Sequence, residues 1–219
     1  MPNKVVVFDL EDTLYQEMDF LKSGYQAVAD YITKSVGKDD LYTEMIEAYQ
    51  AGEKDVFQKV LDDHQLIIDK SELLDIYRYH IPQIHLDSKV RSVLEQLQGK
   101  CHLALITDGR PRTKRNIINA LGLSEFFDGA DVYISDEVGH LKTAPYSFER
   151  IMENNPDCHY MYVGDNPVKD FLVPNRLGWT TVCLLDKGLN IHPQNFTLPV
   201  DYLPQRKIKD ITELLEIVN

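Results

Sequence analysis

The chain of 219 residues is 43% hydrophobic and 26% charged, a balance that is typical of a globular protein and too apolar for disorder. Its 35 acidic residues outnumber its 23 basic residues, and the net charge of -12 disfavours nucleic acid and membrane surfaces as partners because both are anionic. The apolar run at 5–8 is shorter than the core of a signal peptide, which favours a cytoplasmic protein.

Five short apolar runs, each ending in a polar residue, predict strands that are buried on both faces of a parallel sheet. These runs lie at 5–9, 103–107, 132–135, 160–165 and 181–186. Apolar residues at helical spacing lie between them, around 90–97, 117–121 and 148–152. The alternation predicts an α/β fold, in which helices cover both faces of the sheet and sites form at the carboxyl ends of the strands.

The segment 16–84 interrupts this alternation. Apolar positions at helical spacing predict four helices there, around 21–36, 41–49, 56–61 and 73–81. Asp69 and Glu72 have the spacing of a capping box in front of the last helix. We therefore expect an all-helical domain that is inserted into the α/β core just after residue 15.

Acidic residues cluster where two of the predicted strands end. Asp9, Glu11 and Asp12 follow the first strand, and Asp165 and Asp170 follow a later one. A single acid at such a place commonly caps a helix or a loop, but several at one edge of a sheet need a compensating cation. Because carboxylates are hard oxygen ligands, the pattern favours Mg²⁺.

Three further motifs accompany these acids. Thr107-Asp108-Gly109 ends another strand and offers a hydroxyl and a flexible backbone whose amides can cradle an anion. Lys142, within 139–145, can supply a positive charge, although most lysines are solvated surface residues. The segment 163–171 is more specific, because a strand, a Gly-Asp pair, a turn and a second Asp place two carboxylates on one short loop.

In this order, the motifs around Asp9, Thr107, Lys142 and Asp165 resemble those of the haloacid dehalogenase superfamily, most of whose members are Mg²⁺-dependent phosphatases. The resemblance covers almost the whole chain. It implies a Rossmannoid core of residues 1–15 and 85–219 and a helical cap of residues 16–84. It also implies a small phosphorylated metabolite as substrate, such as a sugar phosphate or a nucleoside monophosphate, and leaves the oligomeric state open.

The resemblance also implies a role for each matching residue. Thr107 and the amide of Asp108 match the groups that bind the transferring phosphoryl group. Lys142 matches the lysine that neutralises both the nucleophile and the phosphate. Asp165 matches a direct Mg²⁺ ligand, and Asp170 matches a further acid of the metal site.

Asp9 matches the nucleophile that attacks phosphorus and forms an aspartyl-phosphate, and it also belongs to the metal site. Glu11 stands where the family usually has an aspartate that acts as general acid and base, and its backbone carbonyl matches a metal ligand. The extra methylene displaces the carboxylate by roughly 1 Å, and such a displacement can cost about 100-fold in rate. The sequence therefore favours a working but slower phosphatase.

The sequence leaves alternative functions open. A phosphomutase of the same superfamily would retain the aspartyl-phosphate, and the replacement at Glu11 also allows a catalytically impaired module that binds phosphate or regulates a partner. A dehalogenase is disfavoured because it needs neither Glu11 nor the metal-binding acids. Arg110, Arg112 and His140 are interpreted as loop residues rather than ligands. Candidates for substrate selection at the start of the cap are Tyr15, Glu17, Phe20 and Lys22.

Overall fold

The computed structural model describes residues 3–218. The chain divides into two compact units, one formed by residues up to 18 together with those from 85 onward, and one formed by residues 19–84. The first boundary lies at 19 instead of the predicted 16. The backbone amide of Glu17 donates to the carboxylate of Asp12 at 2.9 Å, and this bond ties residues near the first boundary to the core unit.

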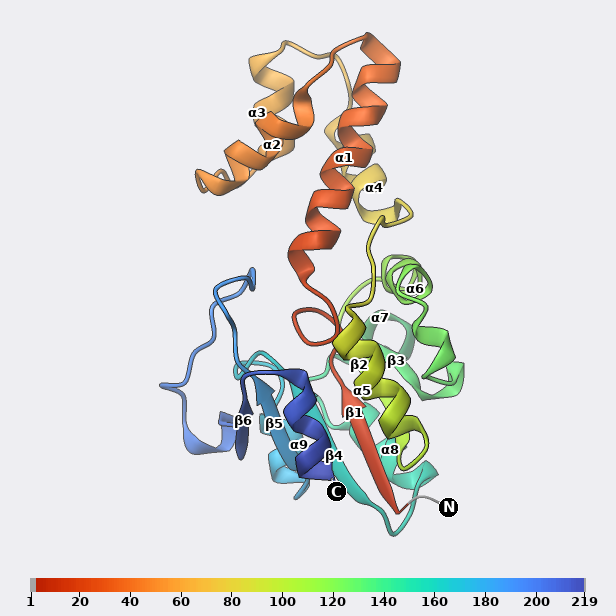
Figure 1. Ribbon diagram of the computed structural model, residues 1–219. Helices are drawn as coiled ribbons and strands as arrows, with labels where there is room; N and C mark the ends of the chain where they lie inside the picture. Colours follow the sequence, from red (N-terminus) through yellow and green to blue (C-terminus); the bar gives the residue numbers. More distant parts are fainter. Residues whose placement is uncertain (1–2, 219) are drawn as a thin grey trace. The chain divides into compact units, whose positions relative to one another are not determined.

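The core unit is built on a parallel six-stranded sheet in the order β3-β2-β1-β4-β5-β6 (Figure 1). Its strands are β1 Lys4–Phe8, β2 His102–Thr107, β3 Val132–Ile134, β4 His159–Gly164, β5 Thr180–Leu184 and β6 Arg206–Ile208. The first five confirm the predicted strands and the α/β fold class. The sixth was not predicted, because its sequence Arg-Lys-Ile carries a single buried apolar residue.

The register of the sheet aligns the carboxyl ends of its central strands. Phe8, the last residue of β1, pairs with Leu105 in β2 and with Val163 in β4. The backbone amide of Asp9 continues the ladder by donating to the carbonyl of Val163 at 2.9 Å. Side chains at the carboxyl ends of these three strands therefore emerge at the same edge of the sheet.

The described part of the core unit has three helices that confirm the predicted ones, α5 Ser88–Gln98, α6 Pro111–Ala120 and α8 Tyr146–Asn154. It also has three short helices that lie outside the predicted ranges, α7 Ser135–Val138, α9 Leu172–Arg176 and α10 Leu214–Val218. Short 3-10 helices lie at Leu123–Glu125, Gly129–Asp131, Val200–Tyr202 and Ile211–Glu213. One face of β1 packs through Val5 and Val7 against Phe148 and Ile151 of α8. Phe8 points to the opposite face, where its ring lies 6.1 Å from the ring of Phe127.

The helical unit contains α1 Glu17–Val36, which starts within the core unit, α2 Leu41–Gln50, α3 Val56–Asp63 and α4 Lys70–Tyr79. These helices confirm the four predicted ones. Asp69 caps α4 by accepting a hydrogen bond from the amide of Ser71. Glu72, its predicted capping-box partner, instead accepts a hydrogen bond of 2.6 Å from the hydroxyl of Tyr31. Within residues 3–218, no helix combines the length and the apolar character that a bilayer crossing requires.

Candidate active site

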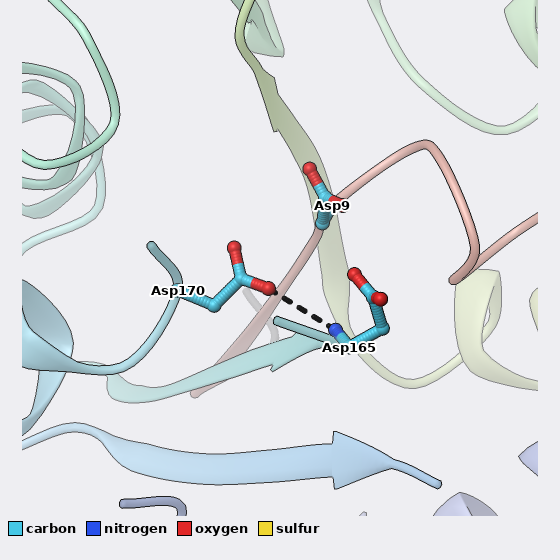
Figure 2. Close-up of side chains that lie close together, drawn as sticks. All are labelled: Asp9, Asp165 and Asp170. Carbon is cyan, nitrogen blue, oxygen red and sulfur yellow. Dashed lines mark hydrogen bonds between the residues drawn. The ribbon is translucent and has the colours of Figure 1, made fainter. Parts of the chain in front are cut away.

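Three buried carboxylates meet at the carboxyl edge of the sheet. Asp9 follows β1, Asp165 follows β4, and Asp170 lies on the loop after β4, with exposed fractions of 3%, 5% and 0%. One oxygen from each carboxylate lies within 4.8 Å of the others. Figure 2 shows the three side chains close together, Asp9 from the segment after β1 and both Asp165 and Asp170 from the segment after β4. The fold thus brings together the acids that the sequence placed 156 positions apart, from 9 to 165.

Asp170 is held in this position by the turn after β4. Its Oδ2 atom accepts hydrogen bonds from the backbone amides of Asp165 at 3.1 Å and Asn166 at 2.7 Å (Figure 2 shows the first). Gly164 makes room for the carboxylate, because a Cβ atom at that position would lie 2.6 Å from Asp170 Oδ2. The glycine of the Gly-Asp pair is therefore required because a larger side chain would collide with Asp170.

Lys142 supplies the positive charge inside this cluster. Its ammonium lies 2.8 Å from Asp9 Oδ1 and 2.7 Å from Asp170 Oδ1. Burial alone would lower the pKa of Lys142, but the carboxylates of Asp170 and Asp9 raise it well above its ordinary value. The lysine therefore stays charged between the two acids.

The cluster holds three carboxyl groups and one ammonium, so its acids can ionise together only if more positive charge is supplied. Burial and repulsion from Asp170 raise the pKa of Asp165 to about 9. Burial also raises the pKa of Asp9 to about 7, against the attraction of Lys142. Among the described residues, ion pairs reach Asp9 and Asp170 but none reaches Asp165. A buried set of carboxylate oxygens with a deficit of positive charge fits Mg²⁺, which prefers hard oxygen ligands.

Residues after β5 hold Asp165 from the other side, and the sequence did not reveal them. The side-chain amide of Asn190 donates to Asp165 Oδ2 at 2.8 Å, and that of Gln194 donates to the backbone carbonyl of Asp165 at 2.7 Å. Asp186 folds the intervening loop by accepting bonds from the amides of residues 188, 189 and 190. No motif marks these residues, because their pairing with Asp165 depends on the sheet order.

Glu11 occupies a different position from the three aspartates. Its Oε2 accepts a hydrogen bond from the Thr107 hydroxyl at 3.0 Å, and its Oε1 lies 2.5 Å from the ammonium of Lys114 and 3.3 Å from the Tyr15 hydroxyl. Burial alone would raise the pKa of Glu11, but Lys114 and the Thr107 hydrogen bond outweigh burial and hold that pKa below its ordinary value. The carboxylate is therefore kept ionised.

The residues predicted to bind the phosphoryl group have other contacts in the structure. The hydroxyl of Thr107, which is fully buried, donates to Glu11. The carboxylate of Asp108 accepts a hydrogen bond of 2.8 Å from the backbone amide of Lys142. Their roles toward a phosphate stay predictions, and the observed bonds show that both residues also organise the site.

The other residues considered in the sequence analysis lie partly in the core unit and partly in the helical unit. Arg110 and Arg112 are exposed at the start of α6, and His140 stacks on Tyr146 with ring centres 4.5 Å apart. Phe20 is buried within the helical unit, where its ring lies 5.7 Å from that of Tyr77. Lys22 is exposed there as well.

Asp12 has a local structural role. Its backbone is left-handed with φ 53°, and its carboxylate accepts hydrogen bonds from the amides of Glu17 at 2.9 Å and Ile191 at 3.3 Å. These bonds connect the segment after β1 with the loop after β5. Asp12 therefore helps to fix the local backbone around the site.

A polar cavity of the core unit joins these groups. Asp9, Glu11, Lys114, Lys142 and Asp165 contribute to its lining. The other lining residues are Asp12, Glu17, Asp108, Asn166, Lys169 and His192. Every one of these side chains is polar or charged, so the described part of the cavity suits a small charged or hydroxylated molecule. Lys114 and His192 were missed by the sequence analysis, since no motif marks them, and Lys169 lies within the motif 163–171 but was given no role.

Known proteins resemble this chain along its whole length. Glyceraldehyde 3-phosphate phosphatase of Methanocaldococcus jannaschii is 28% identical over 233 residues, which cover 98% of this chain and 96% of that protein. The structure of magnesium-bound YfnB from Bacillus subtilis has a TM-score of 0.69 at 18% identity and covers 100% of both chains. A HAD phosphatase from Thermococcus onnurineus has a TM-score of 0.61 at 21% identity and covers 99% of this chain and 98% of that one.

The two solved structures support the fold. A separate comparison of the sequence matches residues 3–178 to the family described as haloacid dehalogenase-like hydrolase. That range includes all four motifs and most of the chain. The chain therefore belongs to the haloacid dehalogenase-like hydrolase family, as the order and spacing of its motifs implied.

Proposed function

We propose that the protein is a Mg²⁺-dependent phosphomonoester hydrolase that acts through an aspartyl-phosphate on Asp9. The observation that carries this proposal is the contact of Asp9 with Lys142 at 2.8 Å, inside a buried cluster with two further carboxylates. A carboxylate nucleophile beside a buried ammonium suits attack on a phosphate group. The family of hydrolases to which the chain belongs supports the same reaction class.

Mg²⁺ would be held by the carboxylates of Asp9, Asp165 and Asp170 together with the backbone carbonyl of Glu11. When bound, it would supply the positive charge that allows a phosphate dianion to approach this acidic cluster. The buried carboxylate oxygens within 4.8 Å of one another, with a deficit of positive charge, support this assignment. The described residues of the cluster offer oxygen ligands, which disfavours zinc.

The proposed reaction begins at Asp9. A carboxylate oxygen of Asp9 attacks phosphorus and forms a new P–O bond, while the P–O bond to the leaving group breaks. Lys142 favours the ionised nucleophile and offsets charge on the phosphoryl oxygens. Water then hydrolyses the aspartyl-phosphate, which regenerates Asp9 and releases inorganic phosphate.

Glu11 is the proposed group for proton transfer in both steps. It protonates the leaving oxygen in the first step and accepts a proton from the attacking water in the second. Its ion pair with Lys114 favours the ionised form, which suits the second step. Because the first step needs the minority protonated form, this geometry supports a slower phosphatase.

The substrate is proposed to be a small sugar phosphate. The cavity in the core unit is lined by polar side chains, and His192 supplies the only ring among the described lining residues, so a nucleobase finds little stacking surface there. The relative from Methanocaldococcus jannaschii is a glyceraldehyde 3-phosphate phosphatase, which favours a short sugar phosphate over a nucleoside monophosphate. The helical unit is proposed to act as the cap that the family resemblance implies, and its residues would contribute to substrate selection.

The first test is hydrolysis of p-nitrophenyl phosphate with Mg²⁺, followed by a panel of phosphorylated sugars and nucleotides. The parent should hydrolyse the dye ester, and Asp9→Asn should lose more than about 1,000-fold in kcat, because an amide is a poor nucleophile. Asp131→Asn, which changes a carboxylate that pairs with His102 and does not belong to the described lining of the cavity, is the matched control and should keep its activity.

Each alternative function gives a different result in this test. A phosphomutase would transfer phosphate between positions of a sugar phosphate and release little inorganic phosphate. A phosphate-binding or regulatory module would bind phosphate without turning over any ester. A folded Asp9→Asn variant with the turnover of the parent would remove Asp9 from the mechanism and contradict the proposed function.

A further inference from the structure

Lys114 is a buried cation whose effect on the position of Glu11 the proposed reaction leaves unspecified. Among the described lysines, only Lys114 and Lys142 are buried, with exposed fractions of 8% and 6%. Lys142 lies between two aspartates of the metal cluster, whereas Lys114 lies 2.5 Å from Glu11 Oε1. A lysine is costly to bury unless a carboxylate compensates its charge, so the pair with Glu11 explains its position.

The backbone provides a path for the Lys114 side chain. Lys114 is the fourth residue of α6, and its stem passes beside Gly109. A Cβ atom on Gly109 would lie 2.6 Å from Lys114 Cε, and Gly109 has φ +141°, a backbone conformation that favours glycine. Gly109 thus leaves room for the lysine to reach the end of β1.

Glu11 is held by three side chains from different segments. Lys114 and Tyr15 contact Oε1, while Thr107 donates to Oε2. A glutamate has one more rotatable bond than an aspartate, so its carboxylate needs more restraint to keep one position. Of the three contacts, the ion pair is the shortest and carries full charge, which makes it the strongest restraint.

We propose that Lys114 is a positioning residue that holds the carboxylate of Glu11 where it can transfer a proton, and so compensates for the longer side chain at this position. The proposal rests on the proposed function, because it assigns Lys114 to the reaction of the same site. Its ammonium acts on Glu11 and not on the substrate. The alternative is a direct contact of Lys114 with the substrate, and the two roles differ in how they depend on the residue at position 11.

A double-mutant cycle tests the proposal. An aspartate at position 11 is shorter by one C–C bond, about 1.5 Å, so we expect its carboxylate to make a weaker and longer contact with the Lys114 ammonium. If Lys114 acts through the longer side chain, Lys114→Met lowers kcat in the parent and changes it much less in a Glu11→Asp background. If Lys114 contacts the substrate instead, Lys114→Met impairs activity in both backgrounds.

The measurement is kcat and KM for p-nitrophenyl phosphate with Mg²⁺ in four proteins: the parent, Lys114→Met, Glu11→Asp and the double variant. We expect Lys114→Met to lower kcat by about 10- to 100-fold in the parent, with KM nearly unchanged, because the proton-transfer group loses its placement while the substrate contacts stay. In the Glu11→Asp background the same change should leave kcat nearly unaltered.

Arg115→Met is the matched control. It removes a cation from the neighbouring position of α6, where Arg115 pairs with Glu137 and not with Glu11. Its kcat should equal that of the parent. Thermal unfolding of every variant separates lost positioning from lost folding. If Lys114→Met does not fold, Lys114→Gln, which keeps a hydrogen-bond donor on a shorter stem, takes its place in the cycle with the same expected dependence on position 11.

Three outcomes overturn the proposal in distinguishable ways. An equal loss of kcat in both backgrounds, or a rise in KM in both, assigns Lys114 to substrate binding. An unchanged kcat in Lys114→Met shows that Glu11 needs no such restraint. A parent that hydrolyses no phosphate ester overturns the proposed function and this proposal together, whereas the first two outcomes leave the proposed function intact.

Discussion

The backbone amide of Lys142 donates a hydrogen bond of 2.8 Å to the carboxylate of Asp108. Asp108 directly follows β2, so this bond ties the loop that carries Lys142 to the end of a central strand. The ammonium of the same lysine lies 2.8 Å from Asp9 at the end of β1. The Asp108 side chain therefore helps to determine where the cation of the site lies.

Asp108→Ala should lower kcat by about 10- to 100-fold, because a loss of the loop anchor displaces the Lys142 ammonium. Asp108→Asn keeps an oxygen acceptor for the Lys142 amide and should retain most of the turnover. The check is kcat for p-nitrophenyl phosphate in both variants. Equal losses in the two variants would show that the charge of Asp108, and not its hydrogen bond, matters.

Mg²⁺ affinity should rise with pH between 6 and 9. Without a cation, burial raises the pKa of Asp9 to about 7 and that of Asp165 to about 9. Below these values protons occupy the carboxylates and compete with the ion, and above them the ionised forms are free to bind it. Calorimetric titration with MgCl2 at several pH values measures this dependence.

Asp165→Ala should weaken the same binding, and EDTA should abolish hydrolysis until Mg²⁺ is restored. Added Mg²⁺ should raise the thermal unfolding temperature of the parent more than that of the variant, because a ligand stabilises the state that binds it. Undiminished hydrolysis in metal-free buffer would reject the metal assignment.

Glu11→Gln should lose about 100- to 10,000-fold in kcat, because the amide transfers no proton to the leaving oxygen or from water. The aspartyl-phosphate should accumulate in this variant, which mass spectrometry of a rapidly quenched reaction detects. Glu11→Asp should retain or increase activity by restoring the usual geometry of the family. A Glu11→Gln variant as active as the parent would favour a water-assisted reaction or a binding module.

Gly164→Ala should destabilise the protein by about 1–3 kcal/mol, because the new Cβ would lie 2.6 Å from Asp170 Oδ2 in a close-packed site. It should also weaken Mg²⁺ binding. Gly129→Ala is the matched control, since its Cβ meets no atom within 4 Å. Urea unfolding of both variants provides the comparison, and equal stabilities would contradict the steric role of Gly164.

Acidification should destabilise the helical unit through His80. Burial lowers the pKa of His80 below 6.5, and the ring contacts the carbonyl of Tyr77 and the hydroxyl of Ser23. The unfolded chain therefore binds more protons, so stability is complete above about 6.5 and falls as the pH drops through that value toward the folded pKa. His80→Gln should show a smaller decrease in thermal stability between pH 7.5 and pH 5.5. An identical decrease in both proteins would exclude His80 as the cause.

The sequence alone determined the fold class, the first five strands, the four helices of the helical unit, three helices of the core unit and the identity of the acids at the strand ends. The physical reason is local. Buried parallel strands need short apolar runs, and amphipathic helices need apolar residues at helical spacing. Parallel strands also bring the residues at their carboxyl ends to one edge of the sheet. Asp9, Thr107 and Asp165 could therefore be named before the structure was known. β6 could not, because Arg-Lys-Ile at an edge of the sheet lacks an apolar run.

The tertiary structure alone decided the partners of those acids. Lys114 contacts Glu11, which is 103 positions away in the sequence, and Asn190 contacts Asp165, which is 25 positions away. No motif marks Lys114 or Asn190. Such pairs depend on which strands are neighbours, on the direction of each side chain and on a glycine that leaves space. The surroundings then decide the charge of each carboxyl group. Lys114 and Thr107 outweigh burial and hold Glu11 ionised, whereas burial and repulsion from Asp170 raise the pKa of Asp165, so that it favours its proton.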